Sequence, residues 1–581
     1  MAEERVIVVG GGLAGLMTTI KIAEMGVPVD IFSFVPVKRS HSVCAQGGIN
    51  AAVNWKGEGD TPWEHFDDSI YGGDFLANQP PVKAMCEAGP AIVFLLDRMG
   101  VPFNRTPEGF LDFRRFGGTK HNRTAFAGAT TGQQLLYALD EQVRRHEVAG
   151  LVRKFEYWEF LSVVLDGTGR CVGITALDQR SMQIHAFPAG AVMLATGGPG
   201  IVFGKSTNSS VNTGGAAGMA YEQGVFYANG EFIQVHPTAI PGEDKLRLIS
   251  ESVRGEGGRV WTYREGKPWY FLEEMYPAYG NLVPRDIATR AIFKVVFEMG
   301  LGIDGQPMVY LDVTHIDAKT LDRKLGGFLE IYEKFMGADP RKVPMKIFPG
   351  MHYSMGGLWV DYNHMTNIPG LFAAGEVDYQ YHGANRLGAN SLLSCLYGGQ
   401  IAGPSMVRYA HSETNGAAEK ALAQEKTRQE EAYARLRKMD GKENVFVLAK
   451  ELGEWMTANV TVIRDNAKLR ATDDKIRELQ ERWTNIGIQD RSGWANQELS
   501  FIKQFRSMLE VARVITLGAL RRDESRGAHY KPAFPERDDA NFLKTTKARW
   551  SSDGPEFSYE AVDTSLIKPR ARKYDVEKTA A

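Results

Sequence analysis

The chain has 581 residues, of which 43% are hydrophobic and 24% are charged, so we expect two or more folded domains and no long disordered region. Its 68 basic and 70 acidic residues leave a formal net charge of −2, which gives no overall attraction for nucleic acid or anionic lipid. The four cysteines lie far apart and lack the spacing of a disulfide scaffold, a zinc site or an iron–sulfur cluster. We therefore expect no metal site and no nucleic-acid partner.

The first residues predict a βαβ unit. Arg5 to Val9 is a short β-branched run typical of a buried parallel strand, and Val29 to Ser33 is a second such run. A helix is expected between them through Met25, directly after the motif GGGLAG at residues 10–15. The start of such a helix presents free N–H groups to a pyrophosphate, so the pattern predicts a dinucleotide site. An acid usually ends the second strand and binds a ribose; Ser33 stands there and can also form that hydrogen bond.

The later segments continue this α/β pattern and then change in composition. Residues 241–349 interleave aromatic, charged and proline residues and indicate an inserted domain with a helix near Asp286 to Glu298. Residues 416–521 are rich in Ala, Glu, Lys, Arg and Leu with helical periodicity, which predicts a helical domain. Residues 522–581 suggest an extended tail that wraps the surface. Further strands are predicted at Phe160–Leu165, Gly173–Leu177, Met182–Phe187 and Ala191–Ala195, and sheet-like sequence at Gly356–Gly375.

The amino-terminal residues lack the basic and apolar regions of a signal peptide. The longest uncharged stretch, Leu387 to Val407, is interrupted by Gly, Asn, Ser and Pro. We therefore expect a soluble, cytoplasmic chain that does not itself span a membrane.

Several loop-like segments place His, Arg, Glu or Ser beside glycines. Taken singly, a histidine is most simply a core or surface residue, and an arginine beside glycine is usually a surface ion-pair partner. Taken together, two arginines and two histidines on tight backbone would bind a small dianion, because Arg grips a carboxylate with two hydrogen bonds and His adds another. The segments are residues 39–42 with 47–48, 234–238, 250–258, 284–286, 352–357 and 382–392.

These motifs occur in the order of one family. GGGLAG, HSVCAQGGINA, HPTA, ESVRGEGG, VPRDIATR, HYSMGG, AAGE and HGANRLGANSLL follow one another, and the tail contains ESRGAHYKPAFPERDD. The chain resembles, over essentially its whole length, the flavoprotein subunit of succinate dehydrogenase and fumarate reductase, and within it the Bacillus-type succinate:quinone oxidoreductases. The resemblance implies a Rossmann-like FAD-binding domain (1–240 and 350–415), an α+β capping domain (241–349), a helical domain (416–521) and a C-terminal segment (522–581).

The resemblance also implies a covalent flavin. His41 matches the histidine that attaches to FAD, and this bond raises the potential of the flavin ring. Oxidation of an unactivated C–C bond needs an oxidant stronger than nicotinamide, so such a flavin suits the reaction. The remaining residues that the resemblance assigns to FAD are Gly10, Gly12 and Gly15 at the pyrophosphate, Glu376 at the ribityl or ribose region, Ser391 and Leu392 at the flavin ring, and Ser33, Ser42 and Gly48 elsewhere in the site.

A dicarboxylate site is implied between the domains. His236 and Ser250 would bind one carboxylate of succinate, and His352 and Arg386 would bind the other, which fixes the C2–C3 bond over the flavin. A hydride would then pass to the flavin while a proton leaves the neighbouring carbon. Arg285 matches the proton-transfer arginine of the family, and Glu251 with Arg254 would form the relay to solvent.

Three departures from the family pattern stand out. Ser250 replaces a common threonine, Gly215 replaces the aspartate of the usual NTGDG, and Ala239 replaces the glycine of HPTG. None of them touches the predicted catalytic arginines, so we expect altered contacts near the flavin and unaltered activity.

The resemblance implies partners as well. An iron–sulfur subunit would take electrons from the flavin to a membrane anchor with a quinone, which would hold the chain at the cytoplasmic face of the membrane. Three alternatives stay open at this point: physiological fumarate reduction, L-aspartate oxidation, and a flavin-binding assembly subunit without turnover. A matching His41 is not expected in an L-aspartate oxidase, which binds FAD non-covalently.

Overall fold

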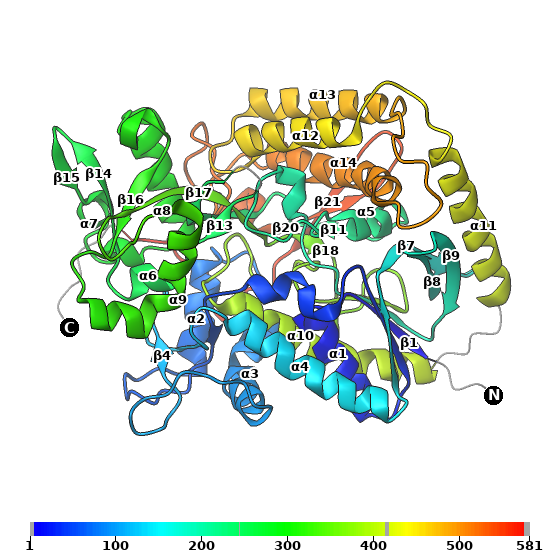
Figure 1. The fold of residues 1–581 in the computed structure, drawn as a ribbon, viewed down its shortest axis with the longest axis horizontal. Helices are drawn as coiled ribbons and strands as arrows, with labels where there is room; N and C mark the ends of the chain where they lie inside the picture. Colours follow the sequence, from blue (N-terminus) through cyan, green and yellow to red (C-terminus); the bar gives the residue numbers. More distant parts are fainter. Residues whose placement is uncertain (1–4, 243–244, 413–417, 575–581) are drawn as a thin grey trace.

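The computed structural model describes residues 5–242, 245–412 and 418–574. The predicted outer limits at residues 1 and 581 and the predicted boundary at 415/416 lie outside these residues. The α/β fold class with a helical C-terminal part is confirmed (Figure 1).

The predicted βαβ unit is confirmed and lies in a five-stranded parallel sheet. Its strands β1 (Val6–Val9) and β2 (Val29–Ser33) are neighbours, and helix α1 (Leu13–Glu24) connects them. Successive residues of β1 point into two different hydrophobic cores, one on each face of the sheet, as expected of a parallel strand covered on both sides. The sheet order is β19-β10-β1-β2-β6, with β10 at Val192–Leu194, β19 at Leu371–Ala373 and β6 at Val152–Glu156.

Helices cover one face of this sheet. Helix α10 (Asn390–Ser412) lies against α1, and α4 (Thr131–Val148) lies against the other side of α1 (Figure 1). The close approach of α10 depends on small residues: a Cβ at Gly399 would lie 2.8 Å from the carbonyl oxygen of Ala14. Helices α2 (Pro62–Gly72) and α3 (Gln79–Arg98) and the small sheet of β3 (Ile49–Asn50), β5 (Thr124–Ala125) and β4 (Phe113–Arg114) complete this part.

An antiparallel sheet covers the opposite face. Its strands β7 (Trp158–Leu165), β8 (Cys171–Asp178) and β9 (Gln183–Pro188) confirm the three strands predicted there. Phe32 in β2 contacts Phe187 in β9 with ring centroids 4.8 Å apart, which joins the two sheets.

The inserted segment has its own hydrophobic core. The long strands β12 (Ile233–Ile240) and β17 (Met345–Ser354) pair antiparallel and lead the chain into and out of it. The predicted helix is α8 (Arg285–Phe293), which continues as a π-helical turn from Lys294 to Glu298. The other elements of this segment are β13 (Arg247–Leu248), α6 (Ser252–Gly255), β14 (Arg259–Arg264), β15 (Lys267–Trp269), α7 (Phe271–Met275), β16 (Val309–Asp312) and α9 (Ala318–Met336).

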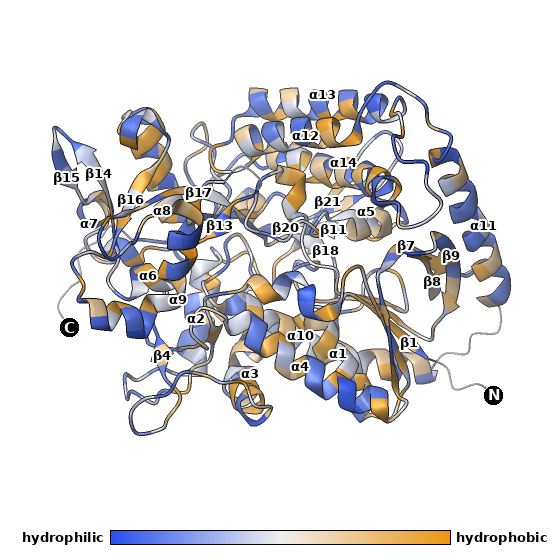
Figure 2. Ribbon diagram, viewed as in Figure 1, coloured by the Kyte–Doolittle hydropathy of each residue, from blue (hydrophilic) through white to orange (hydrophobic). Residues whose placement is uncertain are grey.

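Within the described residues 418–521, the predicted helical region contains four helices. Helix α14 (Gln497–Arg521) is buried along most of its length, and α12 (Val445–Val460) and α13 (Asn466–Trp483) pack on it. Helix α11 (Ala418–Leu436) instead packs on the β7–β9 sheet. Hydrophilic and hydrophobic segments alternate along α11 and α13, as expected of helices with one solvated face (Figure 2).

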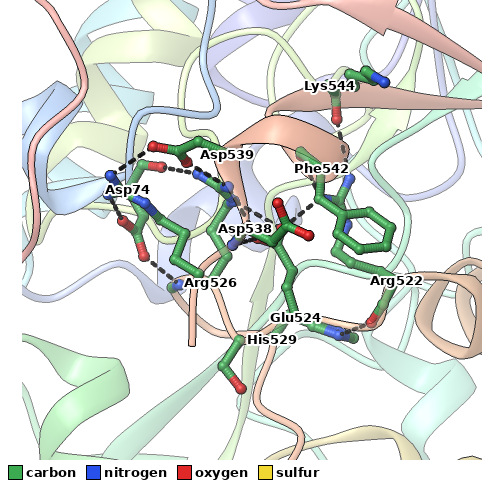
Figure 3. A network of polar contacts seen from close by, with 12 residues as sticks. Asp74, Arg522, Glu524, Arg526, His529, Asp538, Asp539, Phe542 and Lys544 are labelled. Atoms are coloured by element: carbon green, nitrogen blue, oxygen red, sulfur yellow. Dashed lines mark hydrogen bonds and ion pairs between the residues drawn. The ribbon is translucent and has the colours of Figure 1, made fainter. Parts of the chain in front are cut away.

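The predicted C-terminal segment is extended and largely exposed or half-buried, but part of it folds into a small sheet. Strands β20 (Lys544–Arg549) and β21 (Glu556–Ala561) form a hairpin that joins β11 (Tyr227–Ala228) and β18 (Gly357–Leu358) in one sheet. Before the hairpin and the short helix α15 (Asp539–Phe542), the charged residues Arg522, Glu524 and Arg526 are buried and bonded to one another (Figure 3). The sequence does not indicate that these charged residues are buried, because their pairing depends on contacts that composition does not reveal.

Candidate functional site

A large cavity lies at the carboxyl ends of β1, β2 and β10, where ligands of open α/β sheets bind. Almost all of the predicted site residues line it. Gly15 and Arg254 lie directly behind its wall. The lining residues that were predicted are Gly10, Gly12, Ser33, His41, Ser42, Gly48, His236, Ser250, Glu251, Arg285, His352, Glu376, Arg386, Ser391 and Leu392.

The glycine turn brings the backbone of β1 against helix α1. Gly10 has a φ of 116°, and a Cβ there would overlap the carbonyl oxygen of Ala195. A Cβ at Gly15 would overlap the carbonyl oxygen of Gly10, so strand and helix can pack this closely only with glycine. Gly12 precedes the helix, and the N–H of Leu13 donates to Ser42 Oγ at 3.2 Å. A glycine turn of this kind at the start of a helix can hold a phosphate.

His41 begins a short 3₁₀ turn at the cavity wall. Its Nδ1 accepts a hydrogen bond from the N–H of Ser209 at 3.1 Å, and its Nε2 lies 3.0 Å from Asn208 Nδ2. Burial, with a smaller contribution from Lys245, lowers the pKa of His41 to about 4. The imidazole is therefore neutral at physiological pH and has the lone pair that a nucleophile needs.

Two further predicted cofactor residues are fixed by backbone contacts. Glu376 Oε1 accepts from the N–H of Ser354 at 3.0 Å, and burial raises the pKa of this carboxyl to about 7. A Cβ at Gly198 would lie 2.5 Å from Glu376 Oε1, so that glycine gives the carboxyl its space. Gly48 has a φ of 143° and passes close to the carbonyl of Ala125.

The two histidines of the predicted dicarboxylate site face each other. The ring centroids of His236 and His352 are 5.0 Å apart, on the paired strands β12 and β17. His236 Nδ1 accepts from the N–H of Thr238 at 3.2 Å, so its proton lies on Nε2, which is buried and has no partner among the described residues. Burial, followed by the charge of Arg285, holds the pKa of both rings well below the ordinary value. Both rings therefore act as neutral hydrogen-bond donors or acceptors.

Arg386 and Ser250 complete this end of the cavity. The guanidinium of Arg386 lies 4.4 Å from the centroid of the Tyr353 ring, and its buried Nε has no hydrogen-bond partner among the described residues. Burial, with the nearby positive charge of Arg285, lowers the pKa of Arg386 to about 9, so it remains a cation. Ser250 Oγ lies 2.9 Å from Ser252 Oγ. An anion placed here would satisfy the unpaired guanidinium nitrogen.

Arg285, Glu251 and Arg254 form one buried chain of ion pairs. Arg285 Nε donates to Glu251 Oε2 at 2.8 Å, and Arg254 Nη2 donates to Glu251 Oε1 at 2.9 Å. Arg254 continues the chain to the carbonyl of Asn281, at 2.7 Å. Burial lowers the pKa of Arg254, although Glu251 opposes this shift. The chain therefore connects Arg285 by hydrogen bonds to the backbone at Asn281.

Two residues of the site received no role from the sequence. Gln234 accepts from Arg285 Nη1 at 2.9 Å and donates to the carbonyl of Arg386 at 2.7 Å, so one amide orients both arginines. It precedes His236 by two positions in the same strand, and this spacing was the available signal. Phe116 lines the cavity from a loop, and its ring occupies the space that a Cβ at Gly47 or Gly388 would need. No local sequence pattern indicates this role of Phe116.

The residues present fit FAD. Six buried polar atoms that have no partner among the described residues belong to residues lining this one cavity. Such atoms are costly unless a ligand satisfies them, and their spread along the cavity suits an elongated polar ligand. They are Ser40 Oγ, Gln46 Oε1, Thr196 Oγ1, Asn212 Nδ2, His236 Nε2 and Arg386 Nε.

Comparisons with known proteins agree with this geometry. A model described as FAD binding domain matches residues 5–392, and one described as fumarate reductase flavoprotein C-term matches residues 449–574. The succinate dehydrogenase flavoprotein subunit of Bacillus subtilis is 68% identical over 585 residues, which cover 100% of each chain. A quinol fumarate reductase structure from Escherichia coli has a TM-score of 0.93 at 34% identity and covers 99% of each chain. A quinol–fumarate reductase with menaquinol molecules has a TM-score of 0.91 at 33% identity, covering 98% of this chain and 100% of the other.

The described residues offer neither a membrane-spanning helix nor a cluster of metal ligands. None of their helices is long and apolar enough to cross a membrane. No group of three or more His, Cys, Asp or Glu side chains in this part of the chain is arranged to hold a metal ion.

Proposed function

The chain belongs to the flavoprotein family of succinate dehydrogenase and fumarate reductase, and we propose that it oxidises succinate to fumarate at this site. The observation that carries the proposal is the arrangement at one end of the cavity. Two cationic guanidinium groups, of Arg285 and Arg386, stand there beside the neutral rings of His236 and His352. This set suits a small molecule with a carboxylate at each end.

The binding residues would orient the substrate before reaction. His236 Nε2 and the hydroxyl of Ser250 would donate to one carboxylate, while His352 and the unpaired Nε of Arg386 would bind the other. Fixing both ends removes rotational freedom of the central C–C bond, and such positioning lowers the barrier of a reaction by several kcal/mol, about 7 in favourable cases. FAD supplies the acceptor for the hydride that leaves one carbon.

Arg285 would remove the proton from the other carbon. Its Nε is held by Glu251 and its Nη1 by Gln234, so the guanidinium can change its protonation state without moving. An arginine side chain is normally a permanent cation, so this role requires Arg285 to pass a proton to Glu251 before it takes one from the substrate. Glu251 and Arg254 would then pass the proton toward the surface. The predicted capping domain, residues 241–349, would carry Arg285 over the substrate and exclude water.

The covalent bond from His41 to FAD is part of this proposal. The support is a neutral, buried imidazole at the cavity wall, whose Nδ1 is already occupied by the N–H of Ser209. This leaves Nε2, which lies 3.0 Å from Asn208 Nδ2, as the nitrogen for the bond, and its proton would leave as the bond forms. We assign the other predicted FAD residues the roles given above.

The partners follow from the named relatives. An iron–sulfur subunit and a membrane anchor with a quinone would reoxidise the flavin, and they would place the chain at the cytoplasmic face of the membrane. The same groups would serve fumarate reduction, which is the function named for the structural neighbours, so this reverse direction is the second candidate.

The test uses the purified full chain with a soluble electron acceptor. We expect turnover with succinate, reverse turnover with fumarate and a reduced dye, and none with L-aspartate. After acid denaturation, flavin fluorescence should move with the protein band on a gel, and in His41→Ser it should separate from the band. Oxidation of aspartate with a dark protein band would overturn the proposal in favour of an L-aspartate oxidase. Bound flavin without any turnover would favour an assembly subunit.

A further inference from the structure

The far end of the cavity contains a residue from the helical region. Gln504 belongs to α14, which lies outside the segment matched by the FAD-binding model, and yet it lines the cavity together with Ser33, Glu159 and Thr213. Ser33 ends β2, which is the position that meets the ribose in a βαβ dinucleotide site. This lobe, defined here by Ser33, Glu159, Thr213 and Gln504, is therefore the nucleoside end of the cavity.

The amide of Gln504 is held at both of its polar atoms. Its Nε2 donates to Glu159 Oε1 at 2.8 Å, and its Oε1 accepts from Thr213 Oγ1 at 2.9 Å. Thr213 Oγ1 in turn accepts from the N–H of Gly215 at 3.1 Å, which connects the amide to the start of α5 (Gly215–Glu222). A primary amide has two N–H groups and two lone pairs, so one donor and one acceptor site remain.

Gly215 leaves the space that Gln504 occupies. A Cβ at this position would lie 3.2 Å from both Cβ and Cγ of Gln504, which is tighter than ordinary contact. The sequence suggests that an acidic contact is lost at Gly215. In the structure, Gln504 and the buried carboxyl of Glu159 stand beside this position instead.

Two buried polar atoms in the cavity wall could form hydrogen bonds to a ligand. Asn212 Nδ2 and Thr196 Oγ1 have no partner among the described residues, and both side chains line the cavity near Thr213. A fixed amide with one free donor and one free acceptor matches the edge of adenine or a pair of ribose hydroxyls. A simple hydrophobic wall would not need such groups.

We propose that Gln504, oriented by Glu159 and Thr213, recognises the adenosine half of FAD, so that the helical region contributes directly to cofactor binding. Glu159 is a positioning residue, because it acts through the amide of Gln504. This inference depends on FAD binding and not on the succinate chemistry, so its failure would leave the proposed reaction intact.

The test separates the two halves of the cofactor. In the full chain with His41→Ser, where FAD can exchange, bound FAD is displaced by ADP, which carries the adenosine half, or by FMN, which carries the flavin half. Gln504→Met keeps the volume of the side chain and removes the amide. We expect the affinity for ADP to fall about tenfold, the effect of one good hydrogen bond in a buried site, while the affinity for FMN stays within about twofold.

The matched control is Gln480→Met. Gln480 is also a helical-region glutamine that donates to a glutamate, Glu510, at 2.8 Å, but it lies on α13 away from the cavity, and its replacement should change neither affinity. Glu159→Gln keeps an acceptor for the amide of Gln504 and should stay within about threefold of the parent for ADP; it also provides a test if Gln504→Met does not fold. Unchanged ADP affinity in Gln504→Met, or equal loss of ADP and FMN affinity, would overturn the inference. A loss of more than tenfold for both ligands in Glu159→Gln would also contradict it.

Discussion

At the scale of single residues, the site depends on charges whose environment is fixed by neighbours. Glu251 is fully buried and contacts two arginines, Arg285 at 2.8 Å and Arg254 at 2.9 Å. The sequence motifs identify all three residues, because their order along the chain matches one family. For Gln234 the sequence offers only its spacing from His236; its contacts with Arg285 and the backbone of Arg386 depend on how β12 lies against its surroundings.

Arg285→Lys tests the proton-transfer role. Lysine keeps the positive charge but cannot place a nitrogen on both Glu251 and Gln234. We expect kcat for succinate to fall about 10³-fold, within the range for loss of a general acid or base, with dicarboxylate binding changed less than about fivefold. Steady-state kinetics and equilibrium binding of fumarate measure the two quantities. Near-normal turnover would remove Arg285 from the proton path.

At the scale of elements, the βαβ unit was predictable and the hairpin within the C-terminal segment was not. The glycine turn is a largely local pattern. A Cβ at Gly15 would collide with the carbonyl oxygen of Gly10 in the same turn, and a Cβ at Gly10 would collide with the carbonyl oxygen of Ala195. The place of the β20–β21 hairpin depends on β11, a distant part of the chain, and the π-helical turn after α8 has no sequence periodicity that identifies it.

Gly15→Ala tests the glycine turn. The added methyl would overlap the carbonyl oxygen of Gly10, so strand and helix must separate. We expect the loss of most bound FAD and a destabilisation of about 3 kcal/mol. Gly26→Ala is the matched control: its φ of 79° makes alanine unfavourable, but nothing lies within 4 Å of the new Cβ, so the cost should be about 1 kcal/mol with FAD retained. Flavin content and thermal unfolding measure both. Full FAD content in Gly15→Ala would contradict this account of the turn.

At the scale of the whole molecule, the C-terminal segment ties the inserted segment to the FAD-binding part. Arg572 Nη1 lies 2.9 Å from Asp286, which is next to Arg285, the proposed proton-transfer residue, and 3.5 Å from Asp74 beyond α2. Tyr574 packs against Tyr279 with ring centroids 5.1 Å apart. The sequence indicates the charge and aromatic content of this segment but not its partners, which lie hundreds of residues away.

Arg572→Met should destabilise the protein strongly. The Arg572 side chain is only 7% exposed, and its removal leaves the buried carboxylate of Asp286 with one arginine fewer, which typically costs about 3 kcal/mol. Arg570→Met is the control: Arg570 bonds Asp67 at 2.6 Å, but its side chain is 45% exposed, so its loss should cost about 1 kcal/mol or less. The shift of the denaturation midpoint compares the two variants. Equal shifts would show that burial of the Arg572 pair does not matter to stability.

The most direct measurement of the central claim is the flavin absorbance of the purified chain mixed with succinate in the absence of oxygen. The account predicts that succinate bleaches the flavin, that fumarate restores its colour, and that the Arg285→Lys chain binds fumarate but is not bleached on the same timescale. A flavin that stays oxidised with saturating succinate, or that is bleached by L-aspartate and not by succinate, would contradict it.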